Sequence, residues 1–172
     1  MVDLDPQGAL SAGLGLTHDD IEDTIYDVML DSHTSIHSAI QHTGVAGLDL
    51  VPANIDLSAA EIQMVNEVGR EHTLARALRP VRRDYDFIII DCQPSLGLLT
   101  VNALACSQGV IIPMECEFFS LRGLALLTDT VEKVSDRINF DLEVMGILVT
   151  MFDRRTNCLL YTSPSPRDGL LS

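Results

Sequence analysis

Hydrophobic and polar positions along this chain follow two alternating patterns. Short apolar runs bounded by polar or turn residues are typical of strands in a parallel sheet. They occupy residues 1–5 (the end of a strand), 48–53, 85–91, 109–114 and 142–152. Between them, apolar residues recur at three- and four-residue spacing, which predicts helices after Thr17 and over 35–41, 58–78, 95–107 and 119–137. The alternation predicts an α/β fold, a doubly wound, mostly parallel sheet with helices on both faces.

Local signals predict where some of these elements begin and how they are buried. Thr17 is the expected N-cap of the first helix, whose apolar positions include Ile25. Ser58, followed three residues later by Glu61, predicts a reciprocal cap at the start of helix 58–78. Residues 85–91 are an apolar run that predicts a strand buried on both faces.

Composition narrows the class of protein. The 172 residues carry 25 Asp and Glu against 11 Lys and Arg, a net charge of −14, so the overall surface is expected to repel nucleic acid and anionic lipid. No apolar run reaches the roughly 20 residues of a membrane span, and no secretory signal opens the chain. We therefore expect a cytoplasmic protein without membrane attachment. The four cysteines form no C-x-x-C pair, which favours free thiols.

Acidic residues stand at the ends of two predicted strands. Asp3 and Asp5 alternate with apolar residues at the start of the chain, and Asp91 ends the run 85–91. In open parallel sheets the ligand crevice lies outside the carboxyl ends of the strands. Carboxylates gathered there repel one another unless a cation offsets their charge, and Mg²⁺ bound together with phosphate oxygens does so. The alternative is that these aspartates only cap loops.

Five ordered segments resemble one family. They are VDLDPQG with SAGLG, VPANIDLSAAEI, DFIIIDCQPSLGLLTVNAL, IIPMECEFFSLRGLALL and GILVTMFDRRTN. Together they resemble the ParA/Soj chromosome- and plasmid-partitioning ATPases, members of the deviant-Walker class that includes MinD. The resemblance covers residues 1–157 and implies a P-loop NTPase-like fold, with ATP and Mg²⁺ as cofactors.

The resemblance implies roles for the acidic residues. Asp5 is expected to orient or activate the water that attacks the γ-phosphate, and Asp3 to support the adjacent switch loop. Both are therefore candidate catalytic residues. Asp91 resembles the Walker B aspartate, which reaches Mg²⁺ through water. General-base help in phosphoryl transfer is mostly positioning of the attacking group.

Five further positions are expected near the nucleotide by the same resemblance. Pro94 lies in the switch loop with Ser95 and Gly97, although the family more often has T-P-P where this chain has Cys92-Gln93-Pro94. Pro113 and Glu117 match a segment near the nucleotide and the dimer interface. Thr150 and Asp153 match a strand end near the adenine.

Both ends of the sequence suggest a gene fragment, truncated at both ends. The family carries a phosphate loop, K-G-G-x-G-K-S/T, some tens of residues before D-x-D-P-Q, and no G-x-x-x-x-G-K occurs in this chain. Residues 158–172 resemble read-through of a sequencing adaptor, and a genuine Ser/Pro-rich linker is the alternative. We thus expect a partial ATPase domain over 1–157, a non-native tail over 158–172, and no ATPase activity in the fragment itself.

For the intact parent, the resemblance implies a slow ATPase that works as a homodimer. A ParB-type centromere-binding partner would stimulate it, and non-specific DNA would bind through regions absent here. A MinD-like positioning ATPase is the alternative within the class. From a different class, a receiver-like phosphoacceptor module is a further alternative, but it would need a lysine at a late strand end, and the one lysine, Lys133, lies in a predicted helix. The fragment acting as a non-catalytic interaction module is a further alternative.

Overall fold

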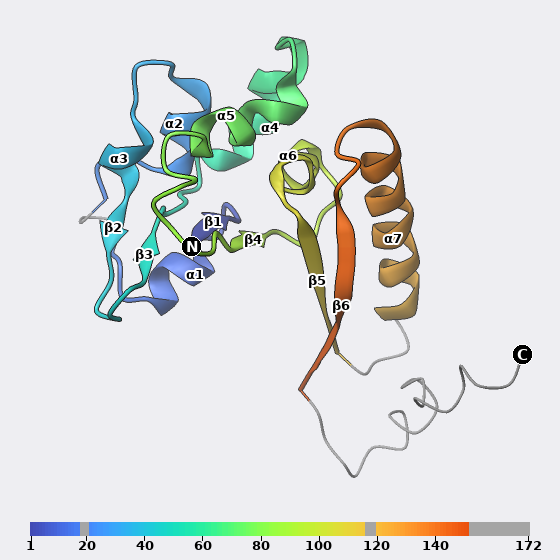
Figure 1. Cartoon of the computed structure of the whole chain (residues 1–172). Helices are drawn as coiled ribbons and strands as arrows, with labels where there is room; N and C mark the ends of the chain where they lie inside the picture. Colours follow the sequence, from blue (N-terminus) through green and yellow to red (C-terminus); the bar gives the residue numbers. More distant parts are fainter. Residues whose placement is uncertain (18–20, 116–119, 152–172) are drawn as a thin grey trace, which may run out of the picture. The chain divides into compact units, whose positions relative to one another are not determined.

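The computed structural model describes residues 1–17, 21–115 and 120–151 (Figure 1). The chain divides into two compact units, Met1–Ser107 and Gln108–Ser172. The predicted boundary at residue 157 and the predicted tail over 158–172 lie outside the described residues, so they stay predictions.

A small parallel sheet organises the first unit. Strand β1 (Val2–Leu4) pairs in parallel with β4 (Ile90–Cys92), so that Asp3 lies opposite Asp91. On its other side β1 bridges in parallel to Val51, directly after β3 (Asp49–Leu50). Strand β3 also forms an antiparallel hairpin with β2 (Gln41–His42), which the sequence analysis missed. The central position of β1 explains why Val2 and Leu4 are buried.

Helices pack around this sheet to form one hydrophobic core. They are α1 (Ala9–Gly13), α2 (Ile25–Leu30), α3 (Ile36–Ala39), α4 (Leu57–Gln63), α5 (Thr73–Leu78) and α6 (Leu98–Cys106). The core combines apolar side chains of β1 with Ile25, Leu57, Leu74 and Leu99 of the helices, and each of these four helical residues is at most 1% exposed. Helices as short as these are stabilised by burial of their apolar faces rather than by their own helix propensity.

A buried asparagine joins α6 to α5 and to the segment just before α5. The Asn102 side chain on α6 is fully buried, and its Oδ1 accepts a hydrogen bond of 3.0 Å from the Leu74 amide of α5. Its Nδ2 donates to the carbonyls of Arg70 and Leu98, both at 2.9 Å. Since buried polar groups are costly without partners, this residue fixes how α6 packs on the segment before α5.

Thr17 was the wrong N-cap for the helix that contains Ile25. Helix α2 begins at Ile25 with Thr24 as its N-cap, seven residues after Thr17. The Thr24 amide and hydroxyl both donate to the Asp27 carboxylate, at 2.9 and 2.8 Å. This pair satisfies polar groups at the helix start, and it therefore determines where α2 begins.

The helix predicted over 58–78 is interrupted, and its predicted cap is wrong. Two short 3₁₀ segments, η2 (Met64–Asn66) and η3 (Arg70–His72), separate α4 from α5. Gly69 between them adopts a left-handed backbone, with φ of 66°, which favours glycine and ends the helical path. Helix α4 begins one residue before Ser58, and Glu61 bonds outside its own helix instead of capping it.

The strand predicted over 85–91 is shorter than expected and is not buried on both faces. Phe87 and Ile89 are 84% and 56% exposed, while Ile88 and Ile90 pack against the core. Val2 pairs with Ile90 and its amide donates to the Ile89 carbonyl at 2.8 Å, so the ladder between β1 and β4 involves only the end of the predicted run.

The second unit is a parallel strand pair with one long helix. Strand β5 (Gly109–Glu115) pairs with β6 (Glu143–Thr150), and α7 (Ser120–Arg137) runs alongside the pair (Figure 1). Val131, Val134 and Leu142 are buried. The elements predicted over 109–114, 119–137 and 142–152 are confirmed in kind. Lys133 lies on α7, paired with Asp129 at 2.5 Å, as the argument against a receiver module required.

Candidate functional site

The parallel register of β1 and β4 brings three carboxylates to one edge of the sheet. Asp3 and Asp91 are partners in the ladder, and Asp5 follows β1 by one residue. Asp91 is exposed as a residue, but the protein around its carboxyl group excludes part of the water and so raises its pKa; the neighbouring charges of Asp3 and Asp5 raise this pKa further. The three groups are thus close enough to repel one another, and the site is electronegative when no cation is bound.

Asp3 is fully buried and its carboxylate is bonded on both oxygens. Oδ2 accepts hydrogen bonds from the amide and hydroxyl of Ser11, at 2.9 and 2.7 Å, and Oδ1 accepts one of 3.2 Å from the Asp5 amide. The Ser11 hydroxyl also accepts from the Ala53 amide at 3.3 Å. Asp3 therefore ties the end of β1 to α1 and to the segment after β3.

Sequence reasoning identified no role for Ser11, and it predicted no helix where α1 forms. The signal was a single hydroxyl residue, eight positions after Asp3, in a stretch of small apolar residues. Gly8, with a left-handed φ of 63°, lets the chain turn directly from β1 into α1. That turn brings Ser11 back to the carboxylate.

Asp5 occupies a different environment. It is half-buried, and its Oδ1 accepts a local hydrogen bond of 2.9 Å from the Gln7 amide, while its carbonyl accepts from the Gly8 amide at 2.9 Å. The carboxylate holds the turn after β1 and remains partly accessible at the edge of the sheet. Asp5 is thus better placed than Asp3 to reach a bound ligand.

Asp91 is exposed, and the loop Gln93–Gly97 follows after Cys92, the last residue of β4. Pro94 and Ser95 are exposed in this loop, and the Ser95 carbonyl accepts a hydrogen bond of 2.6 Å from the Thr100 hydroxyl. Burial raises the pKa of the neighbouring Cys92 thiol to about 12, so it stays protonated at neutral pH. It is not a nucleophile under those conditions.

The remaining predicted site residues belong to the second unit or lie outside the described residues. Pro113 lies on β5 opposite Leu148, and Thr150 ends β6 opposite Glu115, so both are near the carboxyl ends of adjacent parallel strands. Glu117 and Asp153 lie outside the described residues. The residues brought together with Asp91 in the first unit are Asp3, Asp5 and, in the following loop, Pro94.

The chemistry of the carboxylates fits Mg²⁺ bound together with a phosphate. Across the described ranges, no group of three or more His, Cys, Asp or Glu is arranged to hold a metal ion by protein ligands alone. Mg²⁺ characteristically takes one or two carboxylates and completes its six positions with water and substrate oxygens. Asp91 and Asp5 offer oxygens of this kind, whereas the oxygens of Asp3 are already bonded.

Removing the charge of Asp91 should stabilise this chain in the absence of nucleotide. A carboxyl whose folded pKa is raised costs stability as pH rises through the unfolded and then the folded pKa. Asp91→Asn is therefore expected to raise the melting temperature at pH 7 by about 1 to 2 °C, a small effect because the group is exposed. Below the unfolded pKa, near pH 3, the difference should vanish. An Asp91→Asn chain that melts lower at pH 7 would contradict this repulsion.

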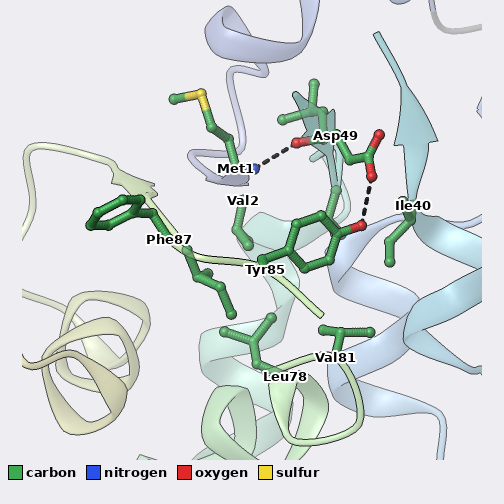
Figure 2. A pocket seen from close by; sticks show the side chains of 11 residues that line it. Met1, Val2, Ile40, Asp49, Leu78, Val81, Tyr85 and Phe87 are labelled. Atoms are coloured by element: carbon green, nitrogen blue, oxygen red, sulfur yellow. Dashed lines mark hydrogen bonds between the residues drawn. The ribbon is translucent and has the colours of Figure 1, made fainter. Parts of the chain in front are cut away.

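A pocket at the other end of β1 is too small for a nucleotide. The pocket has a volume of about 30 Å³. Figure 2 shows Met1, Val2, Leu78, Val81 and Tyr85 around it. The Met1 amino group donates to the Asp49 carbonyl at 2.6 Å, and the Tyr85 hydroxyl donates to Asp49 Oδ2 at 2.7 Å (Figure 2). The bond to Asp49 raises the pKa of Tyr85 to about 12. A cavity of this size holds about one or two waters.

The fold and site define an α/β protein with an acidic edge at the carboxyl ends of parallel strands. The chain belongs to the family whose model is described as "AAA domain" (AAA_31), which matches residues 1–144. An uncharacterised protein of Mycobacterium tuberculosis is 66% identical over 91% of this chain and 49% of its own length. The sporulation initiation inhibitor protein Soj of Bacillus subtilis is 48% identical, over 91% of this chain and 62% of its own length.

Solved structures agree with this assignment. Cobyrinic acid a,c-diamide synthase from Mycobacterium smegmatis, with bound ADP and magnesium, has a TM-score of 0.86 at 40% identity. The match covers 92% of this chain and 66% of the synthase chain. A plasmid partition protein from Borrelia burgdorferi has a TM-score of 0.76 at 26% identity. The match covers 92% of this chain and 68% of the partition protein. The predicted α/β fold class and the resemblance to ParA and Soj proteins are therefore confirmed. The chain spans 49–62% of the length of the two relatives above.

Proposed function

We propose that the complete protein is an ATP-hydrolysing partition protein, an ATP-dependent dimer switch in chromosome or plasmid segregation. The observation that carries the proposal is the group of three carboxylates at the ends of β1 and β4, in a chain 48% identical to Soj. A solved relative contains ADP and magnesium at 40% identity, which supports a nucleotide and Mg²⁺ here as well.

In the proposed reaction, Asp91 and Asp5 would act at the metal and the attacking water, and Asp3 would position the turn beside them. Asp91 would hold Mg²⁺ through water, and the metal would neutralise charge that develops on the phosphate oxygens. Asp5, partly accessible at the end of β1, orients the attacking water. Asp3, with both oxygens bonded, holds the turn that carries Asp5. The loop with Pro94 would border the nucleotide, and Pro113, Glu117, Thr150 and Asp153 remain proposed contacts by resemblance.

The partners of the complete protein are proposed from the same resemblance. They are a second copy of the chain, a ParB-type protein and non-specific DNA bound through regions outside this sequence. The net charge of −14 agrees with a DNA-binding surface that lies elsewhere. Within the described residues, no helix is both long and apolar enough to cross a bilayer. We propose a cytoplasmic, nucleoid-associated protein.

The proposal is tested with the complete reading frame recovered from the genomic DNA. Purified, it should hydrolyse ATP slowly and only with Mg²⁺, and non-specific DNA and the ParB-type partner should increase the rate. The 172-residue chain alone should bind no Mg-ATP at micromolar concentration in calorimetry, since no phosphate-loop motif occurs in it.

Three results would contradict parts of this proposal. Stimulation by anionic vesicles instead of DNA would favour a MinD-like positioning ATPase. A complete protein without Mg-dependent hydrolysis would remove the ATPase assignment. A saturable Mg-ATP site in the 172-residue chain would show that the phosphate cradle does not lie upstream of it.

A further inference from the structure

Helix α6 begins at the end of the loop that follows Asp91, and its cap comes from a distant helix. The N-cap residue Gly97 has no side chain to bond the free amides of the first turn. Instead Glu61 of α4, 38 residues earlier than Leu99, accepts a hydrogen bond of 3.0 Å from the Leu99 amide through Oε1. A carboxylate at a helix N-terminus also interacts favourably with the helix dipole.

The Glu61 carboxylate lies directly against Gly97, where a side chain would begin. A Cβ atom added there would overlap Oε1 of Glu61 and lie 2.8 Å from its Cδ. The backbone of Gly97, with φ of −80° and ψ of −172°, is extended and open to any residue. A side chain at position 97 would therefore meet the Glu61 carboxylate, the far end of a flexible side chain, and would displace it rather than strain the backbone.

The Glu61 contact anchors one end of the loop Gln93–Gly97. The other end is held by the ladder of β4 with β1, which places Asp91 opposite Asp3. Within the loop, the bond from the Thr100 hydroxyl to the Ser95 carbonyl adds a second link to α6. The loop is thus only five residues long and is fixed at both ends.

We propose that Glu61 is a positioning residue for the reaction: by capping α6 across from α4, it sets the conformation of the loop beside Asp91. The inference deepens the proposed function and rests on it. Glu61 acts through the Leu99 amide and Gly97, not on the nucleotide itself. Its loss should therefore affect the rate of hydrolysis more than the affinity for nucleotide.

The test combines three variants with a matched control. Glu61→Ala removes the cap, Glu61→Gln keeps an acceptor for the Leu99 amide, and Gly97→Ala displaces the carboxylate. Glu67→Gln alters an exposed glutamate just beyond the η2 segment and serves as the control. Each change is made in the 172-residue chain for hydrogen exchange and in the complete protein for kinetics.

The expected results are specific to each variant. In Glu61→Ala and Gly97→Ala, the Leu99 amide should exchange at least about tenfold faster, while core amides such as that of Leu57 keep their protection. In the complete protein, kcat should fall about tenfold with KM within about twofold. Glu61→Gln should retain most of both properties, and the Glu67→Gln control should match the wild type.

The double variant Glu61→Ala/Gly97→Ala distinguishes the contact from a general loss of stability. If Gly97→Ala acts by displacing the carboxylate, the double variant should be no worse than Glu61→Ala alone, because the overlap no longer exists. Additive losses would overturn the assignment of Gly97 to this contact.

Failures of the two proposals are distinguishable. If the wild-type complete protein hydrolyses ATP but Glu61→Ala keeps a normal kcat, the positioning role is overturned, whether or not exchange at Leu99 increases. A wild-type complete protein that hydrolyses no ATP would overturn the proposed function and this role with it. Unchanged exchange at Leu99 in Glu61→Ala would overturn the cap itself.

Discussion

Replacing Asp5 by alanine in the complete protein should lower kcat about 100-fold or more, while the Kd for ATP changes less than about threefold. The side chain makes a local hydrogen bond to the Gln7 amide and is only half-buried, so its removal should leave the fold nearly intact. Its proposed task, orienting the attacking water, matters in the transition state rather than in binding. Single-turnover hydrolysis and nucleotide titration measure the two quantities separately.

Two comparisons sharpen this prediction. Asp84→Ala removes an exposed carboxylate elsewhere in the first unit and should leave kcat unchanged. Asp3→Ala removes a buried, fully bonded carboxylate and should instead lower the melting temperature, since the Ser11 hydroxyl and amide lose their acceptor. Equal losses of kcat and ATP affinity in Asp5→Ala would argue against a water-orienting role.

The acidic edge was predictable because it follows from a rule of topology. Asp3 and Asp5 alternate with apolar residues in a short strand, Asp91 ends an apolar run, and parallel strands bring their carboxyl ends to the same edge of a sheet. The sequence also indicated α7 and the β5–β6 pair, because their patterns are long and regular. The sequence did not indicate that Asp3 is buried while Asp5 is accessible. That difference depends on the hydrogen bond between the Ser11 hydroxyl and the Asp3 carboxylate.

Two kinds of side chain were predicted wrongly. Some bond a partner that is distant in sequence, and for others a second residue nearer the helix forms the predicted cap. Ser58 and Glu61 have the spacing of a reciprocal cap, yet Glu61 bonds the Leu99 amide on another helix. Thr17 had the right residue type for a cap, but Thr24 has Asp27 three residues later and forms it. The exposed Phe87 and Ile89 were expected inside, because apolarity alone does not reveal which face is covered.

Asn102→Ala should be the most destabilising single change proposed for this chain. The side chain is fully buried and makes three hydrogen bonds, to the Leu74 amide and to the carbonyls of Arg70 and Leu98. Truncation leaves these groups without that partner and opens a small cavity, so unfolding should become easier by about 2–4 kcal/mol. That corresponds to a melting temperature lower by roughly 5–15 °C for a chain of this size.

A second variant separates the loss of hydrogen bonds from the loss of side-chain volume. Asn102→Asp keeps the volume and an acceptor for the Leu74 amide, but it places a carboxylate against the two carbonyls that Nδ2 now serves. At neutral pH it should therefore destabilise at least as much as alanine, because a buried charge without a partner is costlier than a cavity. The exposed Asn66 provides the control, and Asn66→Ala should melt within about 1 °C of the wild type. If Asn102→Ala also melts that close, the buried amide does not hold α6 against α5, and the Leu74 amide should then keep its exchange protection.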